Sequence, residues 1–452
     1  MENKLEKKYG LFTAIAMVIG IVIGSGVFFK APAILNASGS LSVGILAWIV
    51  GGAIMICCAV TFAIMGTKYE KVNGVVDSAE AAMGRKYGYY IGWFMATIYY
   101  PSLTGVLAYV SGIYFCMLVG WVTIPKAVWA VSLVFLCLSF LLNSMAPKLA
   151  GKWQVSTTVI KLIPLIAMAC GGIAYGTATG NLQTNFAATI PSTATGNPLF
   201  YGVVATAFAY EGWIIATSIN SEIKNAKKNL PLALILGGIV IVVIYLVYFI
   251  GIAGGVQLSA LSAKAGVEQA YANVFGGAIG TILTAFITIS CLGTLNGLTM
   301  GCARGIYSVA IRGEGPAVRR FSKVSDQFNM PMASCVFGFI VALIVLIYFL
   351  PIDYYSMYGK GGGFLFDISE LPIVTIYAMY VPIFIKMIKN ETDLSFGKRY
   401  VLPVLAICGC VFMVVAAVDK YKSMGLWQYL LVFVVVMVIG GTFIGKKRGE
   451  KQ

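Results

Sequence analysis

The chain consists of long apolar segments separated by short polar connections. Residues 235–254, for example, are apolar without the alternation of polar and apolar positions that a membrane-spanning β-strand shows. An apolar run of about 20 residues is long enough to cross a bilayer as a helix. The pattern therefore predicts an all-α integral membrane protein.

Twelve transmembrane helices account for the pattern. The predicted spans are residues 11–35, 41–66, 87–119, 127–142, 155–175, 198–220, 232–254, 273–311, 332–350, 364–388, 401–418 and 426–444. The third and eighth runs exceed the ~20 residues that a bilayer requires, so we expect them to tilt or to continue beyond it. The connections 176–197 and 313–329 are interpreted as loops, which leaves residues 1–452 as a single membrane domain.

Composition and charge agree with this assignment. Hydrophobic residues make up 59% of the 452 residues and charged residues 11%, less than half of the ~25% found in soluble domains. With the N-terminus inside, the inner ends and connections carry 25 of the 32 Lys and Arg, the outer side carries six, among them Lys30, and only Lys161 lies within a span. The net charge of +15 therefore follows the positive-inside rule and does not indicate nucleic-acid binding. We expect a plasma (inner) membrane protein with both termini cytoplasmic.

Several chemistries are disfavoured by what the sequence lacks. It has no histidine, which removes His-based metal sites and Ser-His or Cys-His nucleophile pairs. Its ten cysteines include no C-x-x-C pair, and the N-terminus has no removable signal peptide. No cluster of convergent acid and base residues indicates an enzyme, and no continuous polar face indicates a channel. We expect no cofactor, no metal and no catalytic residue.

The first span contains three consecutive small residues, Gly24, Ser25 and Gly26, where helix propensity is low. Unwinding there would free amides at the start of the outer half-helix, whose positive dipole end favours a carboxylate. It would also free carbonyls of the inner half, which can accept from an ammonium, so an amino acid zwitterion fits both ends. Alternatively, Gly20 and Gly24 form a small-xxx-small packing face, which leaves Ser25 and Gly26 unexplained.

The sixth span is interrupted at residues 208–213, where Glu211 and Gly212 stand in an apolar run. A charge at the bilayer centre costs ~2.5 kcal/mol or more, so Glu211 should face a cavity, pair with a cation or be protonated. Alternatively, it is a neutral structural group that bonds unwound backbone. Breaks in the first and sixth spans are typical of two inverted five-helix repeats with a midplane site, which indicates a transporter. The repeats would cover about 11–176 and 198–389, with two additional helices at about 400–446.

At these motifs the chain resembles the amino acid-polyamine-organocation superfamily, and within it the LAT-type L-amino acid transporters. The resemblance is carried by Gly24-Ser25-Gly26, Pro101-Ser102, Lys161, residues 208–213, the loop 221–231, Leu295-Asn296-Gly297 and residues 304–313. It implies a LeuT-type fold of two inverted five-helix repeats plus two helices. It also implies transport of an L-amino acid by alternating access.

The resemblance assigns roles to individual residues. The amides around Ser25, Gly26 and Val27 would hold the α-carboxylate. The α-amino group would donate to the carbonyls of Val22, Phe208 and Glu211, and Phe208 would also close the outer gate. The remaining expected binding residues are Gly24, Ala209 and Tyr210 in the two breaks, and Ser102, Leu103 and Asn296 at the side-chain end of the pocket. Trp213 either lines that end or serves as a packing or interface residue.

Lys161 has two interpretations. A lysine about seven residues into a span can extend its flexible stem to the headgroups. In sodium-driven LeuT-type relatives a cation site links segments 1 and 8, and a lysine of segment 5 in LAT-type members resembles a fixed ammonium in its place. On this second interpretation the prediction is sodium-independent transport.

Glu211 leaves the substrate open, because many neutral amino-acid carriers have a small residue there. It could meet a cationic side chain, as an aspartate does in members that take dibasic substrates; it could carry a coupled proton; or it could only shape the turn. The predicted function is a sodium-independent exchanger of neutral amino acids, with cationic ones left open. The alternatives are a proton-coupled symporter that uses Glu211 and a polyamine or cationic amino acid permease.

The expected partners are an L-amino acid substrate and the lipid bilayer. Eukaryotic members of the family that the chain resembles bind a heavy subunit through a cysteine between segments 3 and 4. Residues 120–126 contain no cysteine, so no disulfide-linked heavy subunit is expected.

Overall fold

The computed structural model describes residues 10–69, 74–214, 223–261, 266–357 and 366–444. Within these ranges the chain is helical and has no strand, only an isolated β-bridge between Ser40 and Thr189. Parts of the sequence predictions lie outside the described residues: the inner end of segment 6 (215–220), Ser221 and Glu222 of the loop motif, and the basic residues Lys4, Lys7, Lys8, Lys71, Lys264, Lys360, Lys446, Lys447, Arg448 and Lys451.

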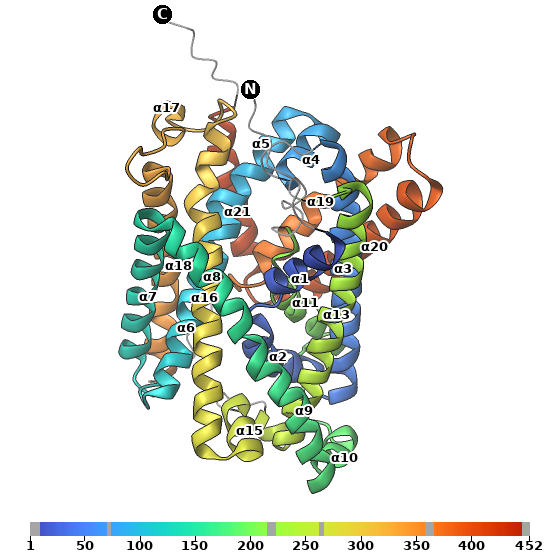
Figure 1. Cartoon of the computed structure of the whole chain (residues 1–452), viewed down its shortest axis with the longest axis vertical. Coiled ribbons are helices and arrows are strands. Elements are labelled where there is room, and N and C mark those ends of the chain that lie inside the picture. The colour runs from blue at the N-terminus through green and yellow to red at the C-terminus, as the bar shows by residue number, and fades with distance from the viewer. Residues whose placement is uncertain (1–9, 70–73, 215–222, 262–265, 358–365, 445–452) are drawn as a thin grey trace, which may run out of the picture. The chain divides into compact units, whose positions relative to one another are not determined.

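The helices follow one another along the chain with short connections (Figure 1). They are α1 (Leu11–Val22), α2 (Gly26–Ser38), α3 (Leu41–Tyr69), α4 (Gly74–Met83), α5 (Arg85–Phe94), η1 (Met95–Tyr99), α6 (Tyr100–Leu118), α7 (Pro125–Met145), α8 (Pro147–Ile160), α9 (Leu162–Thr179), α10 (Asn181–Ala187), α11 (Pro198–Ala209), α13 (Ala226–Gly255), α14 (Leu258–Leu261), α15 (Gly266–Phe275), α16 (Gly277–Ala310), α17 (Val318–Phe321), α18 (Met332–Met357), α19 (Leu371–Asn390), η3 (Gly397–Val401), α20 (Leu402–Tyr421) and α21 (Leu426–Gly441).

Nine helical runs of the described residues are long and apolar enough to cross a membrane, and α1 with α2 forms a tenth span bent by 59°. The shorter apolar helices α11 and α21 occupy the sixth and twelfth predicted positions, so the set is consistent with twelve spans. The third and eighth runs are 34 residues long, about 50 Å as helix, and therefore exceed the ~30 Å hydrocarbon core as predicted.

The limits of some predicted elements were wrong. The fifth span begins at Pro147 and not at 155, because Ala146 alone separates α7 from α8. Asn143 at the end of α7 and Gln154 on α8 both bond to the side chain of Asn296 within the fold. The loops predicted at 176–197 and 313–329 contain the short helices α10 and α17.

The described chain forms two compact units, each made of three separate stretches. The first unit comprises residues 1–74, 156–290 and 373–423, and the second comprises 75–155, 291–372 and 424–452. The broken first and sixth segments both belong to the first unit.

Glycines set the helix packing of the first unit, where α13 packs against α9 (yellow-green and green, respectively, in Figure 1). A side-chain carbon at Gly172 would lie 2.2 Å from the carbonyl oxygen of Gly251, and one at Gly254 would lie 2.1 Å from that of Gly172. Both obstacles are backbone atoms, which cannot move aside as a side chain can. The two helices therefore approach at backbone contact, the arrangement that small residues permit in membranes.

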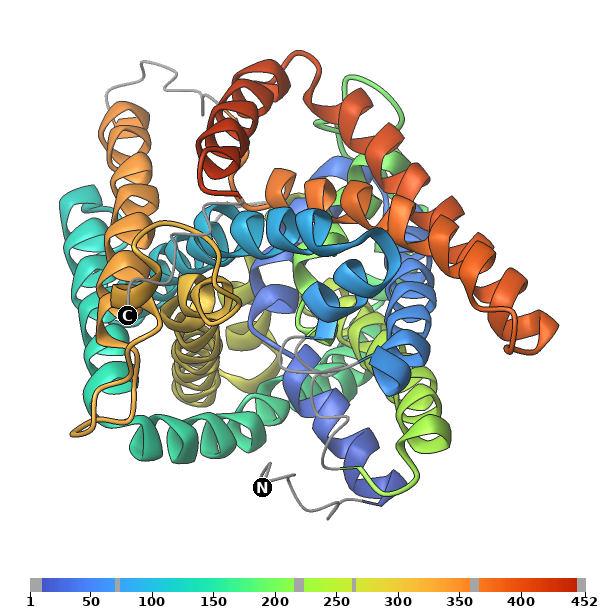
Figure 2. The same ribbon diagram turned by 90° about the horizontal axis from the view of Figure 1, so that it is seen from above.

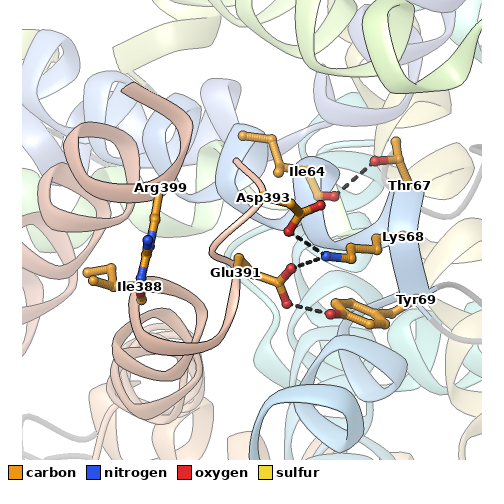
Figure 3. Close-up of polar contacts among 8 residues, drawn as sticks. All are labelled: Ile64, Thr67, Lys68, Tyr69, Ile388, Glu391, Asp393 and Arg399. Atoms are coloured by element: carbon orange, nitrogen blue, oxygen red, sulfur yellow. Dashed lines mark hydrogen bonds and ion pairs between the residues drawn. The ribbon is translucent and has the colours of Figure 1, made fainter. Parts of the chain in front are cut away.

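A charged cluster joins the end of α3 to the connection after α19 (Figure 3). Lys68 donates to the carboxylates of Glu391 and Asp393, the latter at 2.8 Å, and Tyr69 donates to Glu391. Glu391 is buried, so its two donors compensate for the loss of water. The cluster fixes one end of α19 relative to α3.

In the second unit, α6, α7 and α18 pack together and Pro101 interrupts the run α5–η1–α6. A proline has no amide proton to donate to the residue four positions earlier, and the preceding turn, Met95–Tyr99, adopts the wider π-helical geometry. Ion pairs join Arg312 to Asp77 and Arg85 to Glu314 in the same unit.

Candidate functional site

The predicted break in the first segment is present. Helix α1 ends at Val22, Ile23 is extended with ψ 102°, and α2 begins at Gly26 (dark blue in Figure 1). Gly24 and Ser25 form the connection, and both are buried. The low helix propensity of these residues thus coincides with a change of direction of 59° in a continuous apolar stretch.

The start of α2 offers backbone donors. The amides of Gly26 and Val27 have no hydrogen-bond partner among the described residues, while the amide of Phe28 donates to the carbonyl of Ser25 at 3.0 Å. Ser25 and Val27 are fully buried, so these donors lie inside the protein. Buried donors at the positive end of a 13-residue helix are the groups with which a carboxylate pairs.

The second break follows α11. The helix ends at Ala209, and Tyr210 to Gly212 form a turn before the chain becomes helical again at Trp213. Gly212 has φ +107°, a conformation that side chains with a Cβ rarely adopt. The glycine that accompanied Glu211 in the sequence is therefore required by the turn itself.

The two breaks touch each other through their backbones. A Cβ at Gly26 would lie 2.7 Å from Cα of Ala209 and 3.2 Å from the carbonyl oxygen of Phe208. A Cβ at Gly212 would lie 3.0 Å from the carbonyl oxygen of Ile21. The absence of a side chain at both glycines thus lets the free amides of α2 and the last carbonyls of α11 share one small volume.

Two tyrosines hold this arrangement from the side. Tyr245 of α13 donates to the carbonyl of Ala209 at 3.1 Å, and its hydroxyl oxygen lies 3.4 Å from the carbonyl oxygen of Val22. Tyr210 donates to the carbonyl of Trp48 on α3 at 2.8 Å, and its ring packs against those of Trp48 and Tyr245. Sequence analysis missed Tyr245, because a tyrosine in an apolar helix gives no local signal of its partner.

Lys161 lies between α8 and α9, and its ammonium donates to the carbonyl of Gly20 at 2.7 Å. Pro164 lacks the amide that would bond to the carbonyl of Ile160, which explains why the helix is interrupted there. The side chain is 4% exposed, so the ammonium does not extend to the headgroups. Gly20 lies in the last turn of α1, where carbonyl groups have no amide of the same helix to accept from. The ammonium of Lys161 donates to the carbonyl of Gly20 in place of such an amide.

A second buried lysine adjoins Phe208. Lys30 on α2 is 5% exposed and its Nζ lies 5.6 Å from the centre of the Phe208 ring and 5.8 Å from that of Phe29. The rings of Phe29 and Phe208 meet edge to face at 5.1 Å. Lys30 had been counted with the outer charges; its position within residues 11–35, a predicted span, was the signal that it is a buried cation.

Glu211 and Trp213 face a group of buried side chains on α3 and α19. One carboxylate oxygen of Glu211 accepts from the amide of Gly212 at 3.3 Å, and the carboxyl group lies near Cys58 on α3 and near Tyr377 and Tyr380 on α19. Trp213 is fully buried against Phe62 and Tyr380. The packing interpretation of Trp213 accounts for these contacts.

Three expected pocket residues belong to the second unit. Ser102 and Leu103 are buried in the first turn of α6. The amide of Asn296 donates to the carbonyl of Ala150 at 3.1 Å and to the side chain of Gln154 at 3.2 Å, and its oxygen accepts from Asn143 at 2.9 Å. The side chain of Asn296 is thus engaged in a polar network between α7, α8 and α16. Its predicted role at the pocket stays a prediction, as do those of Ser102 and Leu103.

No group of three or more His, Cys, Asp or Glu side chains in the described part of the chain is placed to hold a metal ion. The site therefore consists of backbone groups, two buried ammonium groups, one carboxylate and aromatic rings. Donors at the start of α2 and acceptors at the end of α11 are the groups with which a small zwitterion pairs.

Known proteins resemble this chain over most of its length. The profile of the amino acid permease family matches residues 9–441. The serine/threonine exchanger SteT of Bacillus subtilis is 31% identical over 427 residues, which cover 91% of each chain. The human b(0,+)-type amino acid transporter 1 is 26% identical over 456 residues, covering 97% of this chain and 87% of that protein.

Among solved structures, the crystal structure of MhsT in complex with L-phenylalanine covers 92% of this chain and all of that chain, with a TM-score of 0.61 at 14% identity. At this identity the likeness concerns the fold alone. By the extent of the family match, the chain belongs to the amino acid permease family of the amino acid-polyamine-organocation superfamily, and its fold is of the LeuT type.

Proposed function

We propose that this protein is a sodium-independent exchanger of L-amino acids that works by alternating access. The observation that carries the proposal is the pair of buried amides at Gly26 and Val27, which have no partner among the described residues and lie against the end of α11. A carboxylate bound there would be held by backbone donors and the α2 dipole.

The backbone of the substrate would lie across the two breaks. Its α-carboxylate would accept from the amides around Ser25, Gly26 and Val27. Its α-amino group would donate to the carbonyls of Val22, Phe208 and Glu211. Because these contacts involve only groups common to all amino acids, they fix the zwitterion and leave the side chain to select the substrate.

Sodium independence is inferred from Lys161. Its ammonium bonds the carbonyl of Gly20 at the end of α1 and thus places a fixed positive charge beside the first segment. A covalently attached cation cannot dissociate during the cycle, so transport needs no sodium gradient on this proposal.

Exchange is supported by the relative SteT, a serine/threonine exchanger that is 31% identical over most of both chains. In this cycle Phe208 and its neighbours close over the bound amino acid, and segments 1 and 6 tilt to open the other side. Slow return of the empty carrier would make net flux depend on a second amino acid.

The proposed substrates are small neutral amino acids, with cationic ones accepted through the carboxylate of Glu211. Ser102, Leu103 and Asn296 are proposed to contribute to the side-chain end of the pocket, with Gly24, Ala209, Tyr210 and Trp213 shaping the breaks. The protein would reside in the plasma (inner) membrane with both termini cytoplasmic and would need no disulfide-linked heavy subunit.

A proton-coupled symporter is the second candidate, and the observation that favours it is Glu211, a carboxylate among buried phenols and a thiol.

The exchanger and the symporter can be distinguished with purified protein in liposomes. We expect uptake of labelled serine without sodium only when the liposomes contain unlabelled amino acid. Equal uptake into empty liposomes that increases with an inward proton gradient would contradict exchange and favour the symporter.

Replacing Lys161 by Met should reduce exchange at least about 10-fold. Hydrogen bonds to charged groups contribute about 1.5–3 kcal/mol, and the substitution also leaves the Gly20 carbonyl without its donor. The measurement is the initial rate of serine exchange at equal amounts of folded protein. Lys152→Met, which removes an exposed lysine of α8, is the control; equal losses in both variants would argue for a snorkelling role of Lys161.

Replacing Glu211 by Gln should reduce arginine uptake about 10-fold and leave serine uptake within about 3-fold, because only the cationic side chain loses a charge-assisted hydrogen bond. Competition of unlabelled arginine, and separately of unlabelled serine, against uptake of labelled serine measures how well the variant accepts each amino acid. Glu268→Gln provides the same substitution on α15, away from the breaks. Loss of both substrates in the Glu211 variant would instead assign the carboxylate to the turn.

Replacing Lys30 by Met should raise the KM for serine about 10-fold, since a desolvated cation–π contact contributes about 2 kcal/mol or more and Phe208 would lose it. Lys30→Arg should restore most of the affinity because the guanidinium keeps the charge. The matched control is Lys420→Met. The ammonium of Lys420 lies 5.0 Å from the centre of the Tyr421 ring at the end of α20. A KM that is unchanged in Lys30→Met would show that the contact does not hold the gate.

A further inference from the structure

A group of positive charges without carboxylate partners lies where α19 ends and α20 begins. Lys386 and Lys389 are exposed on the last turns of α19, and Lys398 and Arg399 are on η3. None of the four forms an ion pair with a carboxylate of the described residues. We refer to these four residues as the α19–α20 basic cluster.

The nearby carboxylates are already engaged elsewhere. Glu391 and Asp393 both accept from Lys68 and point toward α3, whereas Arg399 lies on the other side of the connection (Figure 3). The hydrogen bond from Lys68 lowers the pKa of the Asp393 carboxyl, so this carboxylate stays ionised and paired with Lys68. The charge of the cluster is thus not neutralised by the acids of its own loop.

Tertiary contacts hold the cluster together. Nε of Arg399 donates to the carbonyl of Ile388 at 2.9 Å, which brings η3 against the last turn of α19. The guanidinium also lies 4.9 Å from the centre of the Tyr400 ring. These contacts leave its terminal nitrogens without partners among the described residues, and a planar guanidinium presents such donors in the geometry that a phosphate accepts.

Apolar surface begins directly beside the charges. Phe396 is 73% exposed, and an exposed stripe continues along the candidate span that contains α20. The exposed members of the stripe are Val401, Val404, Leu405, Val411, Val415 and Val418. Lys398 and Arg399 directly precede Val401, so the cluster lies at one end of the stripe. Figures 1 and 2 show that the connection between α19 and α20 projects outward there.

We propose that the α19–α20 basic cluster binds the headgroup of an anionic phospholipid whose acyl chains lie along the exposed stripe of α20. Charge and shape complement the two parts of such a lipid: the cluster faces the phosphate, and the valine-rich stripe faces hydrocarbon. An exposed aromatic ring between them is typical of the membrane interface. A soluble acidic partner would use the charges but not the stripe. The positive-inside pattern assigns the site to the cytoplasmic leaflet.

Each Lys or Arg close to an anionic surface strengthens binding about 5-fold, so removing two charges should weaken it by about 25-fold. The test compares the full chain with the double variant Lys398→Gln, Arg399→Gln in detergent, titrated with phosphatidylglycerol or phosphatidylcholine, and counts bound lipids by native mass spectrometry. We expect the unmodified protein to prefer phosphatidylglycerol at least 10-fold and the double variant to lose that preference.

The double variant Arg319→Gln, Arg320→Gln is the matched control, because it removes two exposed arginines of α17 outside the cluster. It should keep the preference for phosphatidylglycerol. An equal loss in both double variants, or no preference in the unmodified protein, would overturn the proposal. Binding of poly-glutamate at the cluster in place of phosphatidylglycerol would also overturn the proposal. Lipid binding is measured without transport, so its outcome is independent of the proposed exchange activity.

Discussion

The proposed substrate site depends on two backbone contacts that only glycine allows. Gly26 brings the first turn of α2 to the end of α11, and Gly212 brings the turn after α11 to the end of α1. Any side chain at Gly26 would meet the backbone of Ala209, which cannot rotate away. Because both contacts join interrupted helices, the free amides at the start of α2 lie opposite the last carbonyls of α11. On the proposed function, the polar groups that an isolated break would leave unsatisfied in the membrane are the groups that bind the substrate where the two breaks meet.

Buried charges then stabilise this unusual backbone. Lys161 satisfies the carbonyl of Gly20 at the end of α1, and Lys30 contacts the ring of Phe208 at the end of α11. An ammonium removed from water is costly unless its partners compensate, so each lysine favours the conformation in which its partner is present. Tyr245 adds a neutral donor to the same region by bonding the carbonyl of Ala209. The breaks are therefore held from three sides: α13, the α8–α9 junction and α2 itself.

Local chemistry made the breaks predictable from the sequence. Gly24-Ser25-Gly26 and Gly212 disfavour a helix by their own propensity, the carboxylate of Glu211 stands out because a charge in an apolar span is costly, and both breaks are where they were predicted. Tertiary partners were not predictable in the same way: nothing near Tyr245 indicates that its hydroxyl meets a segment more than 200 residues earlier. The start of the fifth span was not predictable for the same reason. Asn143 and Gln154 both bond to the side chain of Asn296, more than 140 residues later in the chain.

The contact of Lys161 with Gly20 also bears on the energetics of transport. An ion that enters and leaves with each cycle couples substrate movement to its own gradient, since its binding energy is gained on one side and returned on the other. A tethered ammonium makes the same contact with α1 but is never released, so it stabilises a conformation without supplying free energy from a gradient. In the proposed exchange cycle, the free energy for transport would come from the amino acids themselves. Such a carrier would accumulate one amino acid by releasing another, and this links the buried lysine to the proposed exchange.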